Sequence, residues 1–167
     1  MNFIDEAYLE VRAGDGGSGA SSFRREKYIP FGGPDGGDGG KGGNIFFKVN
    51  QNTNTLIDFQ NKKIFEAKNG QKGSGKNKSG ADGDDLVIHI PKGTVIYDNL
   101  TNEELMDCTD ENLEYLIVKG GEGGHGNARF KSATNRAPRK STPGFKGEVR
   151  SLRLELKSLA DVGLVGC

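Results

Sequence analysis

Short stretches with alternating apolar and polar residues divide this chain into predicted strands. They have the length and the β-branched or aromatic content of strands, and they cover residues 7–13, 44–49, 55–59, 62–67, 86–98, 115–120 and 148–158. Residues 86–98 predict two strands that turn at Pro91–Gly93, and 148–158 alternates except at Ser151. The best candidate for a helix, 102–116, has irregular apolar spacing. The pattern predicts a mainly β fold built on a small β-barrel or sandwich.

Between the predicted strands lie three glycine-rich runs, at 14–19, 30–44 and 120–127. Glycine recurs every third residue in each run, at Gly14, Gly17, Gly33, Gly36, Gly39, Gly42, Gly120, Gly123 and Gly126, with a second phase offset from the first. Three residues per turn is the period of the polyproline II helix, which makes no internal hydrogen bonds. A glycine face allows another backbone to approach, so the runs predict a packed bundle of extended helices. A flexible linker is the alternative interpretation of such composition.

The length of 167 residues is enough for one domain and for the start of a second. Hydrophobic residues make up 33%, and glycine, with 27 residues, accounts for much of the shortfall. Two cysteines are too few for a disulfide framework. The chain shows neither a signal peptide nor an apolar run long enough to span a membrane. We therefore expect a cytoplasmic protein in a reducing compartment.

Charge is balanced overall, with 23 basic and 23 acidic residues, but it is segregated along the chain. One stretch, 98–114, carries acidic residues and no lysine or arginine. Three segments are basic and rich in glycine, aromatic or small polar residues: 21–34, 68–80 and 128–146. Basic side chains neutralise phosphates and aromatic rings stack on unpaired bases, so these segments indicate RNA binding. Solvated surface loops are the alternative for each segment.

Motifs of catalysis and cofactor binding are weak. "GDGGSG" (14–19) and "GEGGHG" (121–126) fit G-x-G-x-x-G, but neither is followed by an amphipathic helix as a dinucleotide site requires. His89 and His125 have no cysteine or histidine neighbour at metal-ligand spacing, so we expect no metal site. The terminal "SLADVGLVGC" (158–167) is a short apolar strand that reaches Gly166, which is compatible with the first glycine of a phosphate loop.

Three quoted segments together resemble the Obg family of bacterial GTPases. They are "EVRAGDGGSGASSFRREKYIPFGGPDGGDGGKGGNI", "VKGGEGGHGNARFKSATNRAP" and "LKSLADVGLVG". The resemblance implies an Obg domain over 1–158, a bundle of left-handed glycine-rich helices set on a small β-barrel. It also implies that 159–167 is the first strand and the start of the phosphate loop of a Ras-like GTPase domain, with Gly166 as the first glycine of that loop.

The resemblance further implies a role in assembly of the large ribosomal subunit and in stress signalling. The expected partner is that subunit with its ribosomal RNA, and the protein is expected to be a monomer that binds no DNA. GTP or GDP with Mg²⁺ would serve the complete protein, whereas these 167 residues alone are expected to need no cofactor and to be inactive. The residues expected to contact RNA are Arg24, Arg25, Lys27, Lys76, Lys78, Arg129, Lys131, Arg136, Arg139 and Lys140, with Tyr28 and Phe130 as stacking groups.

Two other functions remain open at this stage. One is a protein-interaction module that uses the acidic stretch 98–114 as its surface. The other is a structural spacer without a partner of its own.

Overall fold

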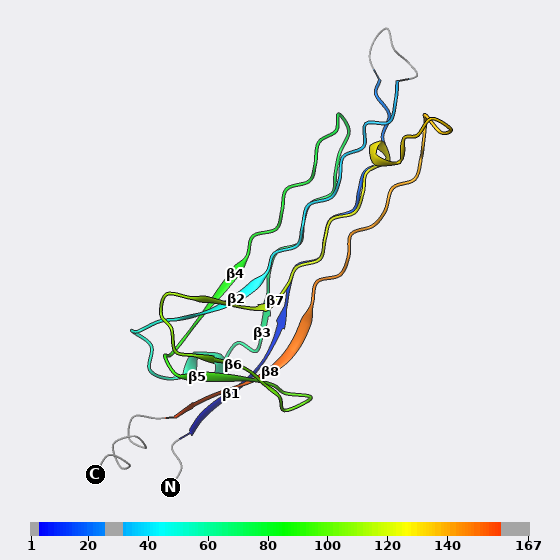
Figure 1. The fold of residues 1–167 in the computed structure, drawn as a ribbon. Helices are drawn as coiled ribbons and strands as arrows, with labels where there is room; N and C mark the ends of the chain where they lie inside the picture. The colour runs from blue at the N-terminus through cyan, green and yellow to red at the C-terminus, as the bar shows by residue number, and fades with distance from the viewer. Residues whose placement is uncertain (1–3, 26–31, 158–167) are drawn as a thin grey trace, which may run out of the picture.

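The computed structural model describes residues 4–25 and 32–157, and Figure 1 shows a base of two β-sheets from which a long bundle of extended chain projects. The strands are β1 (Ile4–Arg12), β2 (Ile45–Val49), β3 (Ile64–Glu66), β4 (Leu86–Ile90), β5 (Thr94–Asp98), β6 (Glu104–Cys108), β7 (Glu114–Val118) and β8 (Val149–Lys157). Two short 3-10 helices, η1 (Ile57–Gln60) and η2 (Asn127–Phe130), are the helical elements of the described residues. The mainly β fold predicted from the sequence is confirmed.

The strands of the base form two open sheets. One sheet has the order β3-β1-β8-β5-β6 and the other has the order β4-β2-β7. Strands β1 and β8 pair antiparallel over their whole length, from Ile4 opposite Lys157 to Arg12 opposite Val149. Strand β3 joins β1 in parallel, as β4 joins β2. The hydrogen-bonded strands of the described residues do not close into the small barrel that the sequence suggested.

One hydrophobic core lies in the base. Along β8, Leu152, Leu154 and Leu156 are buried while the intervening residues are partly exposed, as the alternating pattern predicts for a strand with one covered face. Phe47 of β2 and Ile96 of β5 are fully buried in the same cluster. The core members come from 7–13, 45–59, 88–96, 108, 117–118 and 152–156.

Two local expectations differ from the structure. The stretch 55–59 is not a strand but leads into η1, because Leu56 and Phe59 are three residues apart and are both buried. That spacing matches one turn of a 3-10 helix, and the Asp5 carboxylate accepts hydrogen bonds from the Thr55 hydroxyl and the Leu56 amide. Strand β6 was not predicted, because its burial does not alternate cleanly and it lies at the edge of its sheet.

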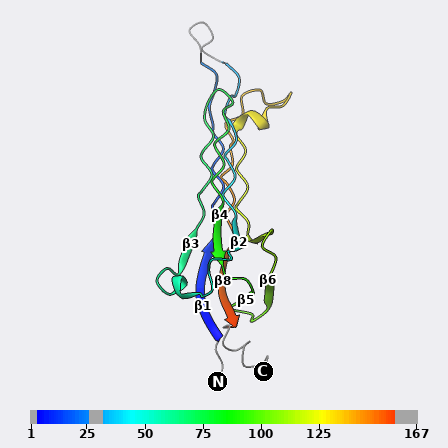
Figure 2. The ribbon, with the colours of Figure 1, turned by 90° about the vertical axis from the view of Figure 1, so that its left-hand side faces the viewer.

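Six extended segments rise from the base and form what we call the glycine bundle: residues 13–24, 33–44, 67–75, 78–85, 119–127 and 139–148. Figure 2 shows them running lengthwise beside one another toward the far end of the molecule. Gly126 has φ −74° and ψ 161°, which lies in the polyproline II region. The packed bundle that the glycine period predicts is therefore present, and the linker interpretation is wrong.

Backbone hydrogen bonds connect the bundle segments at every third residue. The amides of Gly14, Gly17 and Ala20 each donate at 2.9 Å to carbonyls of segment 33–44. Two other amides of segment 13–24, those of Gly16 and Gly19, donate instead to carbonyls of segment 139–148. Segment 33–44 has bonds to segments 13–24, 67–75, 78–85 and 119–127, and so it is the central member of the bundle.

The bundle glycines are required by the close approach of neighbouring backbones. A Cβ at Gly39 would lie 1.8 Å from the carbonyl oxygen of Gly17, and a Cβ at Gly42 would lie 1.8 Å from that of Gly14. The same holds, within 2.1 Å of a carbonyl oxygen, for Gly14, Gly17, Gly36, Gly120, Gly123 and Gly126. Gly33 differs, because its nearest neighbour would be the Lys131 Nζ at 3.7 Å.

Side-chain oxygens accept bonds from bundle amides that do not reach a backbone carbonyl. The Asp82 carboxylate accepts the Lys41 amide at 2.9 Å, and the Asp85 carboxylate accepts the Asn44 amide at 2.8 Å. The Asp15 carboxylate does the same for the Gly147 amide at 2.8 Å. A backbone amide without a partner is costly. These short polar side chains supply the acceptors that the neighbouring backbones do not, and so they complete the hydrogen-bond network of the bundle.

Candidate nucleic-acid interface

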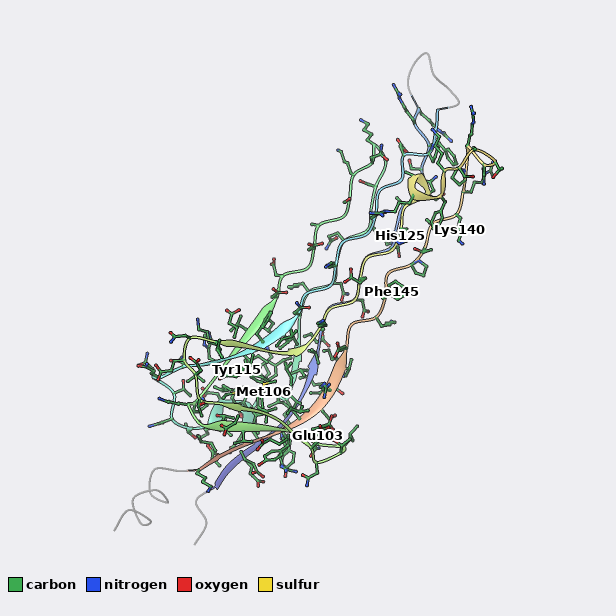
Figure 3. All side chains as sticks on the ribbon, viewed as in Figure 1. Glu103, Met106, Tyr115, His125, Lys140 and Phe145 are labelled. Carbon is green, nitrogen blue, oxygen red and sulfur yellow. The ribbon has the colours of Figure 1, made fainter. Side chains whose placement is uncertain are left out.

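Three loops meet at the end of the glycine bundle that is farthest from the sheets, and we call this region the distal tip (Figures 1 and 3). The loops are 20–25 with 32–35, the turn 74–78, and 127–140. Each loop comes from one of the three basic segments noted in the sequence. Segment 21–34 supplies the first loop, 68–80 supplies the turn 74–78, and 128–146 supplies most of the loop 127–140. The fold therefore brings together basic residues that are far apart along the chain.

A tight turn presents Lys76 and Lys78. Lys76 and Asn77 have φ of 62° and 56°, and the Lys78 amide donates to the Gly75 carbonyl. Two successive positive φ values are the signature of a type I′ hairpin turn. Asp35 holds the turn from the neighbouring segment, because its Oδ2 accepts the Lys76 amide at 3.0 Å and its carbonyl accepts the Asn77 amide at 2.7 Å.

Asn127 fixes the loop 127–140 to the bundle. This side chain is fully buried, and its Oδ1 accepts the Gly36 amide at 2.8 Å. Its Nδ2 donates to the Ser22 carbonyl at 2.9 Å and to the Pro138 carbonyl at 3.1 Å. One amide group thus joins both ends of the long loop to two other segments, which gives the loop a defined position at the tip.

Phe130 lies among polar and charged groups instead of in an apolar core. Its ring is half-buried, and the Lys140 ammonium lies 5.1 Å from the ring centroid. The His125 ring meets it edge-on with centroids 6.3 Å apart, and Figure 3 places His125 and Lys140 together near the tip. The cation–π contact covers one face of the ring, so a base that stacks on that face must displace Lys140.

Arg129 forms an ion pair with Asp38, with 2.5 Å between Nε and Oδ2. Desolvation acts to raise the pKa of Asp38, but the Gly126 amide and the Arg129 guanidinium outweigh it and hold that pKa below its ordinary value. The same carboxylate accepts the Gly126 amide at 2.9 Å. Arg129 therefore meets a competing carboxylate in any contact with phosphate.

The structure brings most of the expected RNA-contacting residues to the tip. Exposed there are Arg24, Arg25, Lys76, Lys78, Arg129, Lys131, Arg136, Arg139 and Lys140. Lys27, Tyr28 and Gly166 lie outside the described residues. The sequence interpretation of 68–80 as a loop needs correction, because 67–75 and 78–85 are both segments of the glycine bundle and only the turn between them is a loop.

The acidic residues of 98–114 lie in the base, at the opposite end from the tip, where Figure 3 shows Glu103. Amides of Thr101 and Leu100 donate to the Asp98 carboxylate and lower its pKa. Burial raises the pKa of the Cys108 thiol to about 12, and the charge of Asp107 adds to the effect. Cys108 is therefore a protonated core group and has no role as a nucleophile.

Three functional positions were missed in the sequence: Asp35, Asp38 and Asn127. Each stands in a glycine run, and each supplies an oxygen to an amide of the bundle or of the turn 74–78. A signal was available for Asp35 and Asp38, because within 33–44 both stand in the phase of the repeat that carries no glycine. Asn127 instead continues the phase of Gly121 and Gly124. Within 4–25 and 32–157, no cluster of histidine, cysteine or acidic residues is arranged to hold a metal ion. No helix of the described chain is long and apolar enough to cross a bilayer.

Comparisons with known proteins show which family the chain resembles in sequence. The chain matches the family model described as GTP1/OBG over residues 4–158. It is similar to a protein named GTPase Obg from Psychrobacter sp. (strain PRwf-1), with 55% identity over 166 residues. That match covers 99% of this chain and 41% of the relative, so the chain spans less than half the length of that protein.

Proposed function

The chain belongs to the GTP1/OBG family, and from this premise we propose that residues 1–158 are the RNA-docking domain of a ribosome-assembly GTPase. The docking surface is the distal tip, and its partner is ribosomal RNA of the large subunit. The observation that carries the proposal is the gathering of exposed arginine and lysine side chains from three loops at one end of an ordered bundle.

Electrostatics supports RNA as the partner of this end. Each phosphate neutralised by lysine or arginine releases condensed counterions, which is the main source of affinity for nucleic acid. The tip combines these cations with small polar residues of the loop 127–140, where the Ser132 hydroxyl bonds to the Thr134 hydroxyl and accepts the backbone amide of Asn135. The acidic stretch lies at the other end of the molecule, so it does not repel RNA from the tip.

The construction of the tip suits a docking role. Asn127 connects the loop 127–140 to the bundle and Asp35 connects the turn 74–78 to it, so hydrogen bonds position both before any partner binds. A preordered surface loses less conformational entropy on binding than a disordered one. The glycine bundle separates the tip from the base, so the tip can enter a recess on a large particle while the base stays outside.

We propose further that the complete protein hydrolyses GTP with Mg²⁺ in a domain that follows the Obg domain, as the name of the relative suggests. Residues 159–167 would begin that domain, with Gly166 in its phosphate loop. These 167 residues by themselves would neither bind nor hydrolyse GTP. Binding of a fluorescent GTP analogue with Mg²⁺ to this chain would contradict that part of the proposal. The complete protein is proposed to act as a cytoplasmic monomer.

Co-sedimentation with purified large ribosomal subunits across a salt series tests the docking function, with small subunits as the control. We expect selective binding that weakens with salt, with a slope of about 0.7–0.9 per phosphate contact in log–log form. Reversal of charge at Arg136, Arg139 and Lys140 should weaken binding and reduce the salt slope. Reversal at the exposed base residues Lys62, Lys63 and Lys157 provides a matched control that should leave binding unchanged.

Two results would count against the proposal. Equal loss of binding in the tip and base variants would show that only overall charge matters. Binding that does not depend on salt would favour a protein-interaction module instead, since phosphate contacts are strongly salt-dependent.

A further inference from the structure

A cleft of about 490 Å³ opens at the distal tip between the first loop and the turn 74–78. It is lined by residues 22–25, by Asp35 and by the turn residues 75–77. Binding sites for small ligands have volumes of roughly 300–1,000 Å³, so one nucleotide fits in this cleft.

Asp35 lines this cleft, and one of its two carboxylate oxygens is buried without a partner in the described part of the chain. Asp35 is only 8% exposed, and its Oδ2 accepts the Lys76 amide at 3.0 Å. Its Oδ1 is buried and accepts no hydrogen bond from residues 4–25 or 32–157. An unsatisfied buried acceptor is costly, and one at a cleft wall indicates a donor that arrives with a ligand.

Gly75 keeps the space beside that oxygen open. Most bundle glycines face a backbone carbonyl at about 2 Å, but Gly75 does not. A Cβ at Gly75 would instead meet the Ser22 hydroxyl at 2.9 Å and Asp35 Oδ1 at 3.8 Å. Packing of the bundle therefore does not require glycine here, and a methyl group at this position would lie 3.8 Å from the free acceptor.

The rim of the cleft differs in charge from its wall. Arg24, Arg25 and Lys76 are exposed where they line it, and Phe23 offers a half-buried aromatic ring. A ligand that suits these groups carries a phosphate for the cations, a flat ring for Phe23, and an N–H donor for Asp35. A cationic amine would be repelled by the rim, and a simple anion would be repelled by the carboxylate.

We propose that this cleft binds one unpaired RNA nucleotide whose base carries an exocyclic amino group, with Asp35 Oδ1 as the acceptor. The proposal rests on the RNA-docking function and adds a base preference to it. On the Watson–Crick edge adenine, cytosine and guanine present an amino group, whereas the single N3–H donor of uracil is flanked by two carbonyl oxygens, which a carboxylate repels. The tip would therefore distinguish adenine and cytosine from uracil at one position, while its other contacts to phosphate do not depend on sequence.

The test uses fluorescence anisotropy with labelled hexaadenylate, hexacytidylate and hexauridylate on the 167-residue chain at fixed salt. We expect the first two to bind about five- to tenfold more tightly than hexauridylate, the discrimination that one good contact to a base edge provides. Asp35→Asn should abolish or reverse this preference. Its oxygen must stay on the Lys76 amide, which leaves an NH₂ group in the position of Oδ1.

Gly75→Ala is the second variant. It adds a methyl group beside Asp35 Oδ1 without changing the charge of the cleft. Its methyl group should lower the affinity for hexaadenylate and hexacytidylate to the level of hexauridylate, while rotation of the Ser22 hydroxyl lets the turn fold. Gly33→Ala is the matched control, since among the described residues its Cβ would meet only Lys131 Nζ, at 3.7 Å. Circular dichroism and melting of each variant verify that the fold is retained.

Failure of this inference is distinguishable from failure of the docking function. Equal affinity for the three oligonucleotides, or a preference that survives both Asp35→Asn and Gly75→Ala, overturns the inference. Absence of any oligonucleotide binding also overturns it. In each case salt-dependent co-sedimentation with the large subunit decides separately whether the tip docks on RNA.

Discussion

The base and the glycine bundle of this molecule are held together by different forces. In the base, side chains such as Phe47 and Ile96 are removed from water in one hydrophobic core. Beyond Ala13, which lies at the junction, the described bundle segments contribute no member to that cluster of buried residues, and they are joined by hydrogen bonds between backbones. The stability of the base therefore depends on the volume of its buried side chains. The stability of the bundle depends on glycine, which has no side chain, at the positions where backbones meet.

The difference teaches how each region responds to a change of one carbon atom. A core can relax partly around a missing methyl group. The bundle has no comparable freedom, because the atom that a new methyl group would meet is a carbonyl oxygen of the neighbouring backbone.

Gly39→Ala should have the largest effect. The new Cβ would lie 1.8 Å from the Gly17 oxygen, so the segments must separate and several hydrogen bonds break together. We expect a loss of at least about 4 kcal/mol in the free energy of unfolding, the range of exceptional single substitutions. Denaturant unfolding, with hydrogen exchange to compare bundle and base amides, measures it. Gly33→Ala should cost under about 1 kcal/mol, and an equal cost for both would refute the steric explanation.

Asn127→Ala should rank second. It removes three side-chain hydrogen bonds and leaves the Gly36 amide buried without its acceptor. Unsatisfied buried groups cost about 1–3 kcal/mol, and we expect about 2–3 kcal/mol here. Hydrogen exchange should accelerate at residues 20–24 and 136–140 but not in β1 or β8. Uniform acceleration over the whole chain would show that tip and base unfold as one unit.

Ile96→Val gives the counterpart in the base. Ile96 is fully buried, and loss of one methylene from a core usually costs about 0.5–1.5 kcal/mol. We expect about 1 kcal/mol in denaturant unfolding, with the bundle amides retaining their protection. A cost close to that of Gly39→Ala would remove the contrast between the two regions.

The smallest expected effect is on the stability of the protein at low pH, and it concerns Asp38. The pKa of Asp38 is lower in the folded protein than the ordinary value of 3.8, so its contribution to stability is present above that pH and is lost as the pH falls below it. Asp38→Asn keeps an oxygen for the Gly126 amide but removes the charge opposite Arg129. The variant should be slightly less stable at neutral pH and less sensitive to acid between pH 4 and the folded pKa. Parallel pH curves for the two proteins would contradict the assignment.

Sequence alone predicted the parts of the fold that depend on local pattern. The turn at Pro91–Gly93 lies between β4 and β5 as expected, and the period of three identified the central bundle segments. The outer segments were not recognised as bundle members, because they carry glycine in one phase, as at Gly144 and Gly147. An outer segment approaches fewer neighbouring backbones than a central one, so it needs glycine at fewer positions and its period of three is harder to recognise in the sequence.

Features that depend on spatial neighbours could not be predicted. The cleft at Asp35 exists only because residues 22–25 and 75–77 meet at the tip. Likewise, the contact between Phe130 and Lys140 is formed by a loop whose course Asn127 fixes from another segment. The chemistry of the tip was visible in the basic segments, but their mutual positions follow from the tertiary fold.

The bundle glycines also have a consequence for the gene. Every glycine codon begins with two guanines, and any change at either of those letters replaces glycine by a residue with a Cβ or by a stop signal. At Gly39 or Gly42 that Cβ has no room. Saturation mutagenesis should therefore find that missense changes at these codons are as damaging as nonsense changes, while third-letter changes are silent.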